Sequence, residues 1–461
     1  MEKRSSFSGS IGFVLAAAGS AVGLGNIWRF PYLAAKDGGG RFLVIYIILA
    51  LTFGFTLLMT EVAIGRKTKQ SCLTAYGRLH KKWGFLGGLA SIVPFIIMPY
   101  YCVIGGWVLK YALVFISGQG AAAAGDGFFE RFTTGYAEPI VYNLVFLLLT
   151  AVVIFRGVNK GIESLSKVLM PILFVLIIGI AIYSLTLKGG EDTDGRTAMQ
   201  GLAKYVIPDF TGTGVRDVLM TIMDAMGQLF YSISVAMGIM VTYGSYYKDE
   251  DNLIGSVNQI EFFDTVVAFL AGVMIIPAVY VFLGDAGLEK AGPGLLFEAM
   301  PKIFAQMGVA GNIFGALFFI MVLFAALTSC ISIMEAICSG MIDKGMSRKK
   351  ATVTEGIIAL VLSTVVCLGY NVLDFVKLPL PGGDAANILG IMDYLANNIL
   401  MPLLAIGTCI LIGWVLKPKT IIDEATKNGE RFGRKWLYIA MIKVVAPLLL
   451  VILLLGSLGV Y

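Results

Sequence analysis

The chain has 461 residues, of which 57% are hydrophobic and only 14% are charged, a balance that indicates a polytopic membrane protein rather than a soluble one. Its formal net charge of +5 is better explained by basic loops on one side of a membrane than by binding to nucleic acid. The six cysteines form no Cys-x-x-Cys pair, and five of them lie in apolar segments, so we expect no disulfide framework. We also expect no cleavable signal peptide, because the first apolar stretch belongs to the predicted fold.

Eleven hydrophobic segments are candidates for membrane spans. They cover approximately residues 11–36, 41–65, 86–117, 138–155, 164–186, 214–244, 253–283, 309–342, 352–372, 386–416 and 436–459. Several exceed the roughly 20 residues that a span needs, which favours tilted, broken or extended helices. We interpret residues 1–461 as a single transmembrane domain.

Basic residues gather in alternate loops, and this distribution predicts the orientation. With eleven spans, the basic residues of five regions all fall on one side. These regions are the N-terminus and residues 66–82, 156–167, 344–350 and 417–435. Acidic residues predominate on the other side. The positive-inside rule then places the N-terminus in the cytoplasm and the C-terminus outside.

The first span contains a stretch that a membrane helix tolerates poorly. Residues 19–31 include three glycines within seven positions, then Arg29 and Pro31. A broken helix is tolerated in lipid only where its freed backbone groups line a cavity or bind something. We therefore predict two half-helices that meet at a binding site, with carbonyl ends suited to a cation and N–H ends suited to an anion.

The sixth span is the second interrupted element. Small and hydroxyl residues crowd its centre, at Ser232, Ser234, Ala236 and Gly238. Interruptions in spans one and six favour five-plus-five inverted repeats, with the binding site between them. We expect repeat one over about 11–186, repeat two over about 214–416, and an extra helix over about 436–459.

Spans seven and eight carry polar groups suited to a small hard cation. Ala325, Thr328 and Ser329 fall on one face of span eight. Asp264 lies deep in the apolar run of span seven, where a lone carboxylate needs a partner such as a cation. Ordinary hydrogen bonding between helices is the alternative for the serine and threonine.

The single histidine, His80, lies in a basic loop. It cannot form a catalytic triad or a histidine-based metal cluster in the membrane, so we predict that the protein is not an enzyme.

These motifs together resemble the neurotransmitter:sodium symporter family. The features that carry the resemblance are residues 19–31, the Tyr100-Tyr101 pair before Trp107, Gln228 in span six, and the Thr328-Ser329 pair. The resemblance implies an all-α integral membrane protein with the leucine-transporter-type fold, in which helices one and six are broken and eleven helices span the cell membrane of a prokaryote. It also implies sodium-coupled import of amino acids.

The resemblance implies two bound Na⁺ ions. The ligands of the first would be Ala21, Asn26, Ser232 and Asp264, together with the carboxylate of the substrate. Asp264 replaces an asparagine of the leucine transporter, and its charge could take the place of chloride, so we expect chloride independence. The ligands of the second would be Gly19, Val22, Ala325, Thr328 and Ser329.

The resemblance also implies an amino-acid site. Leu24 and Gly25 would offer backbone N–H groups to the substrate carboxylate, Tyr101 would add its hydroxyl, and carbonyls near Ala21, Tyr231 and Ser234 would hold the ammonium group, with Ser232 close by. Gly23 stands where transporters of biogenic amines carry an aspartate, which favours a substrate with an intact carboxylate. The pocket for the side chain would be uncharged and lined by Ile97, Tyr231, Ser234, Met237, Ser329 and Ile333, so a hydrophobic or aromatic L-amino acid fits best.

Gates on both sides follow from the same resemblance. Arg29 and Asp393 would form the external pair through water, near Gln228 and above Tyr101 and Tyr231. The cytoplasmic gate would consist of Arg4, Ser245, Tyr246 and Asp343, with Phe7 where the family has a tryptophan anchor. Gly161 and Pro171 resemble a device that unwinds helix five, and a simple proline kink is the alternative.

We therefore predict a sodium-coupled symporter that imports neutral hydrophobic L-amino acids by alternating access. Two alternatives stay open. One is a proton-coupled carrier that uses Asp264, and the other is a non-transporting receptor or a leak channel with the same fold.

Overall fold

The computed structural model describes residues 5–190, 193–288, 293–381 and 385–460. In these ranges the chain is almost entirely helical, and the two strands β1 (Leu378–Pro379) and β2 (Ala385–Ala386) form one short antiparallel pair. Arg4, which we assigned to the cytoplasmic gate, lies outside the described residues.

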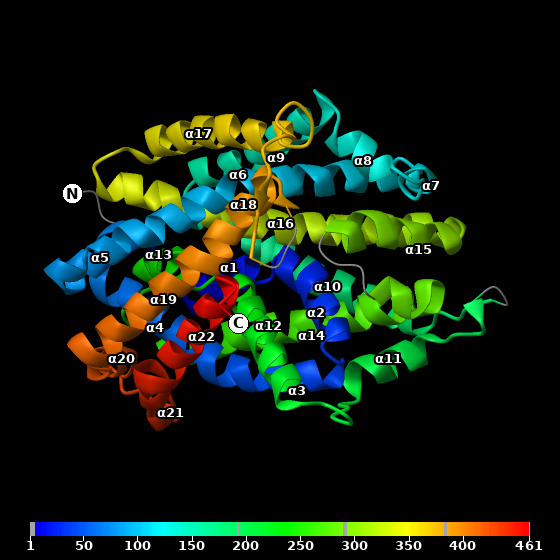
Figure 1. The fold of residues 1–461 in the computed structure, drawn as a ribbon. Coiled ribbons are helices and arrows are strands. Elements are labelled where there is room, and N and C mark those ends of the chain that lie inside the picture. The colour runs from blue at the N-terminus through cyan, green and yellow to red at the C-terminus, as the bar shows by residue number, and fades with distance from the viewer. Residues whose placement is uncertain (1–4, 191–192, 289–292, 382–384, 461) are drawn as a thin grey trace.

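Long apolar helices make up most of the molecule (Figure 1). Nine helices in the described ranges are long and apolar enough to cross a membrane. They are Gly40–Thr68 (α3, η2, α4), Lys81–Ile116 (η3, α6), Glu138–Phe155 (α9), Val158–Leu185 (η4, α10), Leu253–Leu288 (α14), Val309–Asp343 (α16), Arg348–Leu368 (α17), Ile388–Val415 (α18, η7, α19, η8) and Lys435–Ser457 (α21, η9, α22).

The two remaining predicted spans are the broken ones. The first consists of α1 (Ser10–Ala21), η1 (Gly25–Arg29) and α2 (Phe30–Lys36), and its halves are bent by 52°. The sixth is divided into α12 (Val215–Ser232) and α13 (Ile239–Tyr246), with six non-helical residues between them. In the part of the chain that the structure describes, the candidate spans therefore number nine, or ten with the bent pair counted as one span, and the count of eleven stays a prediction.

Short helices fill the connections. They are α5 (Cys72–Leu79), α7 (Gly120–Ala123), α8 (Phe128–Thr133), α11 (Ala198–Val206), η6 (Leu295–Ala299), α15 (Met300–Gln306) and α20 (Lys419–Ala425). The apolar spans predicted at 138–155, 253–283 and 309–342 lie within helices whose ends agree closely with those limits.

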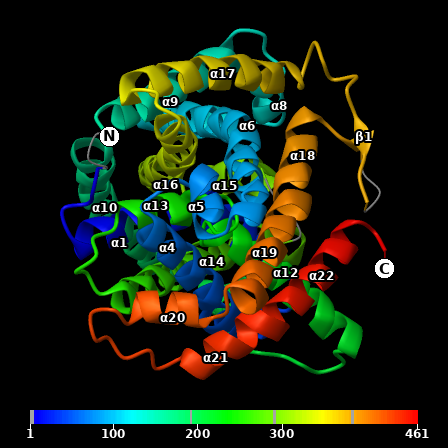
Figure 2. The same ribbon diagram turned by 90° about the vertical axis from the view of Figure 1, so that its left-hand side faces the viewer.

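The broken helices lie in the interior of the bundle. Viewed as in Figure 2, α17 and α9 run along one side and α20 and α21 along the opposite side, with α4, α13 and α14 between them. Helix α1 packs against α10, α14 and α16, while α13 packs against α4. Both halves of the interrupted spans are consequently surrounded by continuous helices, which supply the apolar contacts that a short half-helix cannot provide alone.

The turn between α2 and α3 carries a buried acidic group outside the spanning helices. Asp37 is 6% exposed, and one of its carboxylate oxygens has no hydrogen-bond partner among the described residues. Burial, together with the nearby Asp224 carboxyl, raises the pKa of Asp37 to about 7 despite the opposing charge of Lys36. Lys36 instead pairs with Asp224, with 2.6 Å between Nζ and Oδ2.

This raised pKa predicts a pH-dependent stability. Unfolded aspartate titrates near pH 4, so the folded state binds the proton more tightly, and the free energy of unfolding should fall as the pH rises from about 4 to about 7. We expect the thermal midpoint of the purified protein in detergent to fall by several degrees over this interval, at about 2–4 °C for each kcal/mol. The variant Asp37→Asn should lose most of that dependence.

Asp209→Asn is the matched control, because Asp209 is exposed and hydrogen bonds from Thr211 lower its pKa. Its titration lies below this pH interval, so the variant should retain the wild-type profile. An unchanged profile for Asp37→Asn would show that Asp37 does not titrate in this range.

Candidate functional site

The breaks in the two interrupted spans contact each other directly. The Ser234 hydroxyl donates to the Ser20 carbonyl oxygen at 3.0 Å, and the two serine hydroxyls are 3.1 Å apart. The Ser329 hydroxyl of α16 donates to the same Ser20 carbonyl oxygen at 3.0 Å. Gln228 of α12 donates through Nε2 to the Gly25 carbonyl oxygen at 3.0 Å. Ser234 and Ser329 thus satisfy a carbonyl that the first break frees, whereas the Gly25 carbonyl also accepts from the Phe30 N–H.

The second break adopts an unusual backbone. Ser234 and Ala236 have positive φ angles of 53° and 57°, and Gly238 follows at 73°. Left-handed conformations at non-glycine residues are strained and persist where surrounding contacts hold them. Glu61 of α4 supplies one such contact, because its Oε1 accepts a hydrogen bond from the Ala236 N–H at 2.7 Å.

Glu61 was not among the predicted site residues. Its sequence signal is the one that singled out Asp264, namely a carboxylate within an apolar span, here the span predicted at 41–65. It is 3% exposed, and its second carboxylate oxygen has no partner among the described residues.

Three of the residues assigned to the first ion site lie together. The Asp264 Oδ1 accepts hydrogen bonds from Asn26 Nδ2 at 2.8 Å and from the Ser232 hydroxyl at 2.7 Å. Ser232 is also 3.1 Å from the Asn26 amide oxygen. Tyr46, which the sequence reasoning missed, donates to Asp264 Oδ2 at 3.3 Å.

This group fits a hard cation. Asn26, Ser232 and Asp264 are each 0% exposed, and among the described residues no lysine, arginine or histidine lies within 4.0 Å of the Asp264 carboxylate. A buried carboxylate without a counter-charge is costly, and carboxylate, amide and hydroxyl oxygens are the ligands that hard cations prefer. Ala21, the fourth predicted ligand, ends α1 beside the break and is 1% exposed.

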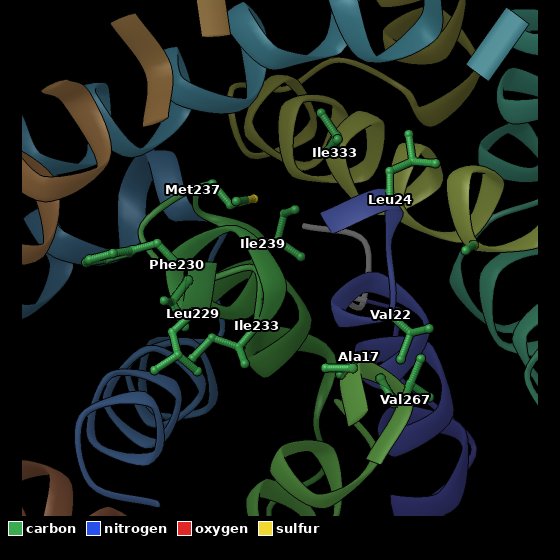
Figure 3. Close-up of a cluster of buried hydrophobic side chains, with 14 of the residues drawn as sticks. Ala17, Val22, Leu24, Leu229, Phe230, Ile233, Met237, Ile239, Val267 and Ile333 are labelled. Atoms are coloured by element: carbon green, nitrogen blue, oxygen red, sulfur yellow. The ribbon is translucent and has the colours of Figure 1, made fainter. Parts of the chain in front are cut away.

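The residues assigned to the second ion site face each other across α1 and α16. A methyl group on Gly19 would lie 3.4 Å from Thr328 Cβ and 3.2 Å from Met170 Sδ. The Thr328 hydroxyl donates to the Ala325 carbonyl oxygen at 3.1 Å, within its own helix. Val22 is buried at the break, where Figure 3 shows it next to Ala17 and Val267. The Ser329 hydroxyl contacts the first span by donating a hydrogen bond to the Ser20 carbonyl oxygen.

Gly23, Tyr101 and Ser329 meet at the other side of the first break. A methyl group on Gly23 would lie 2.8 Å from Ser329 Oγ and 3.3 Å from Tyr101 Oη. The Tyr101 hydroxyl is buried and has no hydrogen-bond partner among the described residues. A buried hydroxyl without a partner is available to a ligand acceptor such as a carboxylate.

Apolar residues enclose this junction. Ile97, Met237 and Ile333 are 2%, 5% and 3% exposed. Figure 3 shows Leu24 at the first break and Ile333 on α16, with Met237 on the segment between α12 and α13. The ring of Tyr231 covers Gly25 so closely that a methyl group there would overlap it. All six residues belong to the predicted substrate site, and the fold brings Leu24, Gly25, Tyr231, Met237 and Ile333 to the region of the two breaks.

The residues of the predicted external gate lie near one another without a direct ion pair. Among the described residues, Arg29 and Asp393 have no nitrogen–oxygen contact within 4.0 Å. The Arg29 guanidinium is instead 6.0 Å from the centre of the Tyr231 ring and 3.5 Å from the Gly227 carbonyl oxygen. Asp393 accepts a hydrogen bond from Asn397 at 2.6 Å. A link through water, as the sequence predicts, stays a prediction.

The predicted cytoplasmic gate is packed closed in its described part. The Phe7 N–H donates to the Tyr246 carbonyl oxygen at 3.1 Å, and the Phe7 ring lies edge-on to Tyr243 and Tyr246. Phe7 is 1% exposed, so phenylalanine occupies the anchor position by apolar packing. Ser245 is buried on α13 beside Tyr246.

Asp343 at the end of α16 holds the start of α5. Its Oδ2 accepts from the Ser71 N–H at 2.7 Å and from the Thr74 hydroxyl at 2.8 Å. The Tyr246 hydroxyl donates to Glu335 at 2.6 Å, and Glu335 pairs with Arg348 of α17 at 2.7 Å. The gate residues are therefore linked to helices on both sides of α13.

Helix five is continuous in the structure. Gly161 lies in the π-helical turn η4 (Val158–Glu163), and Pro171 lies inside α10 (Ser164–Leu185). The proposed unwinding between them stays a prediction.

Comparison with known proteins identifies the family. The sequence model of the sodium:neurotransmitter symporter family matches residues 4–121 and 137–461. The chain belongs to this family. It is 34% identical over 469 residues to the uncharacterized sodium-dependent transporter YhdH of Bacillus subtilis, covering 100% of this chain and 99% of that relative. It is 24% identical to the human sodium- and chloride-dependent GABA transporter 2, covering 92% and 75%.

The fold also matches a solved structure. The crystal structure of MhsT in complex with L-phenylalanine agrees with a TM-score of 0.85 at 34% identity, and the match covers 99% of this chain and 100% of that chain. The predicted leucine-transporter-type fold with broken helices one and six is confirmed. The family consists of sodium-dependent secondary transporters in membranes, so the prediction that the protein is not an enzyme is also confirmed.

The contact between Gly25 and Tyr231 gives a stability prediction. In Gly25→Ala the new methyl group overlaps the Tyr231 ring, so the ring or the half-helix must shift. Overpacking of this kind costs about 1–3 kcal/mol. We expect a lower thermal midpoint for the purified variant in detergent than for the wild type.

Gly88→Ala is the matched control, since a methyl group on Gly88 of α6 meets nothing within 4 Å. Alanine favours a helix over glycine by about 1 kcal/mol, so this variant should be at least as stable as the wild type. Equal midpoints for the two variants would contradict the close packing of Tyr231 on Gly25.

Proposed function

We propose that the protein is a sodium-coupled importer of neutral, hydrophobic L-amino acids that works by alternating access with two Na⁺ ions. The observation that carries the proposal is the position of the buried Asp264 group, which lies at the same pair of helix breaks as the unpartnered Tyr101 hydroxyl. A zwitterionic substrate between them would place its carboxylate near both the cation and the hydroxyl.

Coupling follows from shared ligands. The substrate carboxylate would complete the coordination of the ion at Asn26, Ser232 and Asp264, while that ion would neutralise the carboxylate in a buried site. Each therefore raises the affinity of the other by the same factor. The second ion, at Gly19, Val22, Ala325, Thr328 and Ser329, would hold α1 against α16.

The substrate class is supported by the pocket walls and by the relative. Ile97, Met237 and Ile333 are apolar and almost completely buried, and the absence of a side chain at Gly23 lets the Tyr101 and Ser329 hydroxyls lie close to the first break. MhsT, with 34% identity, was crystallised with L-phenylalanine. Bulky apolar side chains, aromatic ones included, are the proposed substrates.

Chloride independence rests on Asp264. Its carboxylate accepts hydrogen bonds from Asn26, Ser232 and Tyr46, so a fixed negative charge already stands where an anion would be recruited. A chloride ion placed beside it would be repelled and would add no charge balance. The basic loops place the N-terminus in the cytoplasm and the C-terminus outside in this proposal.

Uptake into proteoliposomes tests the proposal. We expect L-phenylalanine and L-leucine to accumulate under an inward Na⁺ gradient, unchanged when chloride is replaced by gluconate. A proton gradient alone should not drive uptake, because Asp264 would serve as a sodium ligand. Uptake driven by H⁺ alone would favour the proton-coupled carrier. Saturable Na⁺-dependent binding without accumulation would favour the receptor, and a steady uncoupled current would favour the leak channel.

The role of Asp264 has its own test. Asp264→Ala removes the carboxylate and leaves Asn26 and Ser232 without their shared acceptor, so we expect concentrative uptake to be lost. The matched control is Asp374→Ala, which removes an exposed carboxylate that pairs with Lys377 at 3.1 Å in the loop after α17. This control should transport like the wild type. Wild-type accumulation by Asp264→Ala would eliminate the first sodium site.

A further inference from the structure

Three sulfur atoms meet directly behind the candidate substrate site. The Sγ atoms of Cys102 on α6 and Cys330 on α16 are 3.7 Å apart. The Cys330 thiol lies 3.9 Å from the Sδ of Met98, which is one helical turn before Cys102 on α6. All three side chains are 0% exposed, and both cysteines are free thiols.

The sulfur–sulfur distances agree with three-coordinate metal binding. A first-row metal ion forms bonds of about 2.3 Å to sulfur. Three such bonds in a plane at 120° separate the sulfurs by about 4 Å, because the side of the triangle is √3 times the bond length. Two sides of the triangle, Cys102–Cys330 at 3.7 Å and Cys330–Met98 at 3.9 Å, match this spacing.

The chemistry of the donors selects the ion. Thiolate and thioether sulfurs are soft ligands that favour Cu⁺, whereas Na⁺ and other hard cations favour oxygen. Zn²⁺ needs four ligands in a structural site, and only three sulfurs gather here. Thiolates rather than thiols ligate metals, so Cu⁺ bound by both cysteines displaces two thiol protons and leaves a Cu–S group with one net negative charge.

We propose that Met98, Cys102 and Cys330 form a binding site for a soft monovalent metal ion, Cu⁺, and that its occupation inhibits the transporter. The inhibitory part rests on the proposed function. The sulfurs adjoin residues of the candidate substrate site, since Ile97 and Tyr101 precede Met98 and Cys102 by one residue each, and Ser329 precedes Cys330.

Inhibition follows from this one-residue offset. Neighbouring positions on a helix are rotated by about 100°, so the sulfurs lie beside the face that carries Tyr101 and Ser329. A metal that joins Cys102 to Cys330 ties α6 to α16 at the level of these two residues. Any substrate binding that needs a small adjustment of Tyr101 or Ser329 would then be opposed.

Binding is tested first, without transport. Purified protein is titrated anaerobically against the coloured Cu⁺–bicinchoninate complex, and the loss of colour reports the transfer of Cu⁺ to the protein. We expect one tight equivalent in the wild type. X-ray absorption at the copper edge should show three sulfur neighbours at about 2.3 Å.

Variants assign the ligands. Met98→Leu keeps the volume but removes the thioether, and it should leave a two-sulfur spectrum and a lower affinity. Cys330→Ser should abolish the tight equivalent. Loss of an outer-shell partner of a metal site already costs about 10–100-fold in affinity, so loss of a ligand should cost at least as much. Cys409→Ser, which removes an equally buried thiol on α19, is the matched control and should bind like the wild type.

The metal site and its inhibitory role are tested by separate outcomes. A wild-type spectrum without three sulfur ligands, or equal loss of binding in Cys409→Ser, would overturn the metal site. In uptake, micromolar Cu⁺ should inhibit the wild type and Cys409→Ser but spare Met98→Leu and Cys330→Ser. Equal inhibition of all four would overturn the inhibitory role. Absence of uptake in every protein before copper is added would count against the proposed function, whereas the titration would still decide the metal site.

Discussion

The structure depends on satisfying the backbone groups that two helix breaks leave open inside an apolar bundle. In a membrane no water replaces a lost intrahelical hydrogen bond, so each freed carbonyl or N–H needs a partner from the protein or a ligand. Ser234 and Ser329 donate to the Ser20 carbonyl, and Glu61 accepts from the Ala236 N–H. Gln228 adds a second donor to the Gly25 carbonyl, which also accepts from the Phe30 N–H. These side chains come from α12, α16 and α4 and the segment between α12 and α13, so the breaks are stable only when those elements are assembled around them.

The same assembly buries a negative charge that needs a cation to balance it. It buries Asp264 with Asn26, Ser232 and Tyr46 as hydrogen-bond donors and, among the described residues, without a cationic side chain in contact. Three donors stabilise the charge in part, but none of them neutralises it. Dependence on sodium, which the family shares, is therefore consistent with a fold that leaves one negative charge to be balanced by a mobile ion.

Hard and soft ligands lie side by side on α6 and α16. Tyr101 and Ser329 present oxygen to the junction of the broken helices, while Cys102 and Cys330 place sulfur one residue further round each helix. The helical rotation per residue keeps the two donor sets on adjacent faces. A site for a hard ion and a soft-metal site can therefore share the same pair of helices without sharing ligands.

Periodicity, composition and local chemistry in the sequence determined the helices, the two interruptions and the membrane setting. Glycines before Arg29 and Pro31, and small residues around Ser234, weaken a helix wherever they occur, so the breaks could be predicted locally. The lone carboxylate of Asp264 could be identified for the same reason. Only the tertiary structure decided which partners meet, because contacts over more than 200 residues, such as Asn26 with Asp264, depend on packing and not on spacing. Tyr46 and the Cys102–Cys330 pair became visible only when the helices were placed together, since each looks like an ordinary residue of an apolar span until its neighbour is known. Glu61 stands out in the sequence as Asp264 does, but only the structure shows that it holds the Ala236 N–H.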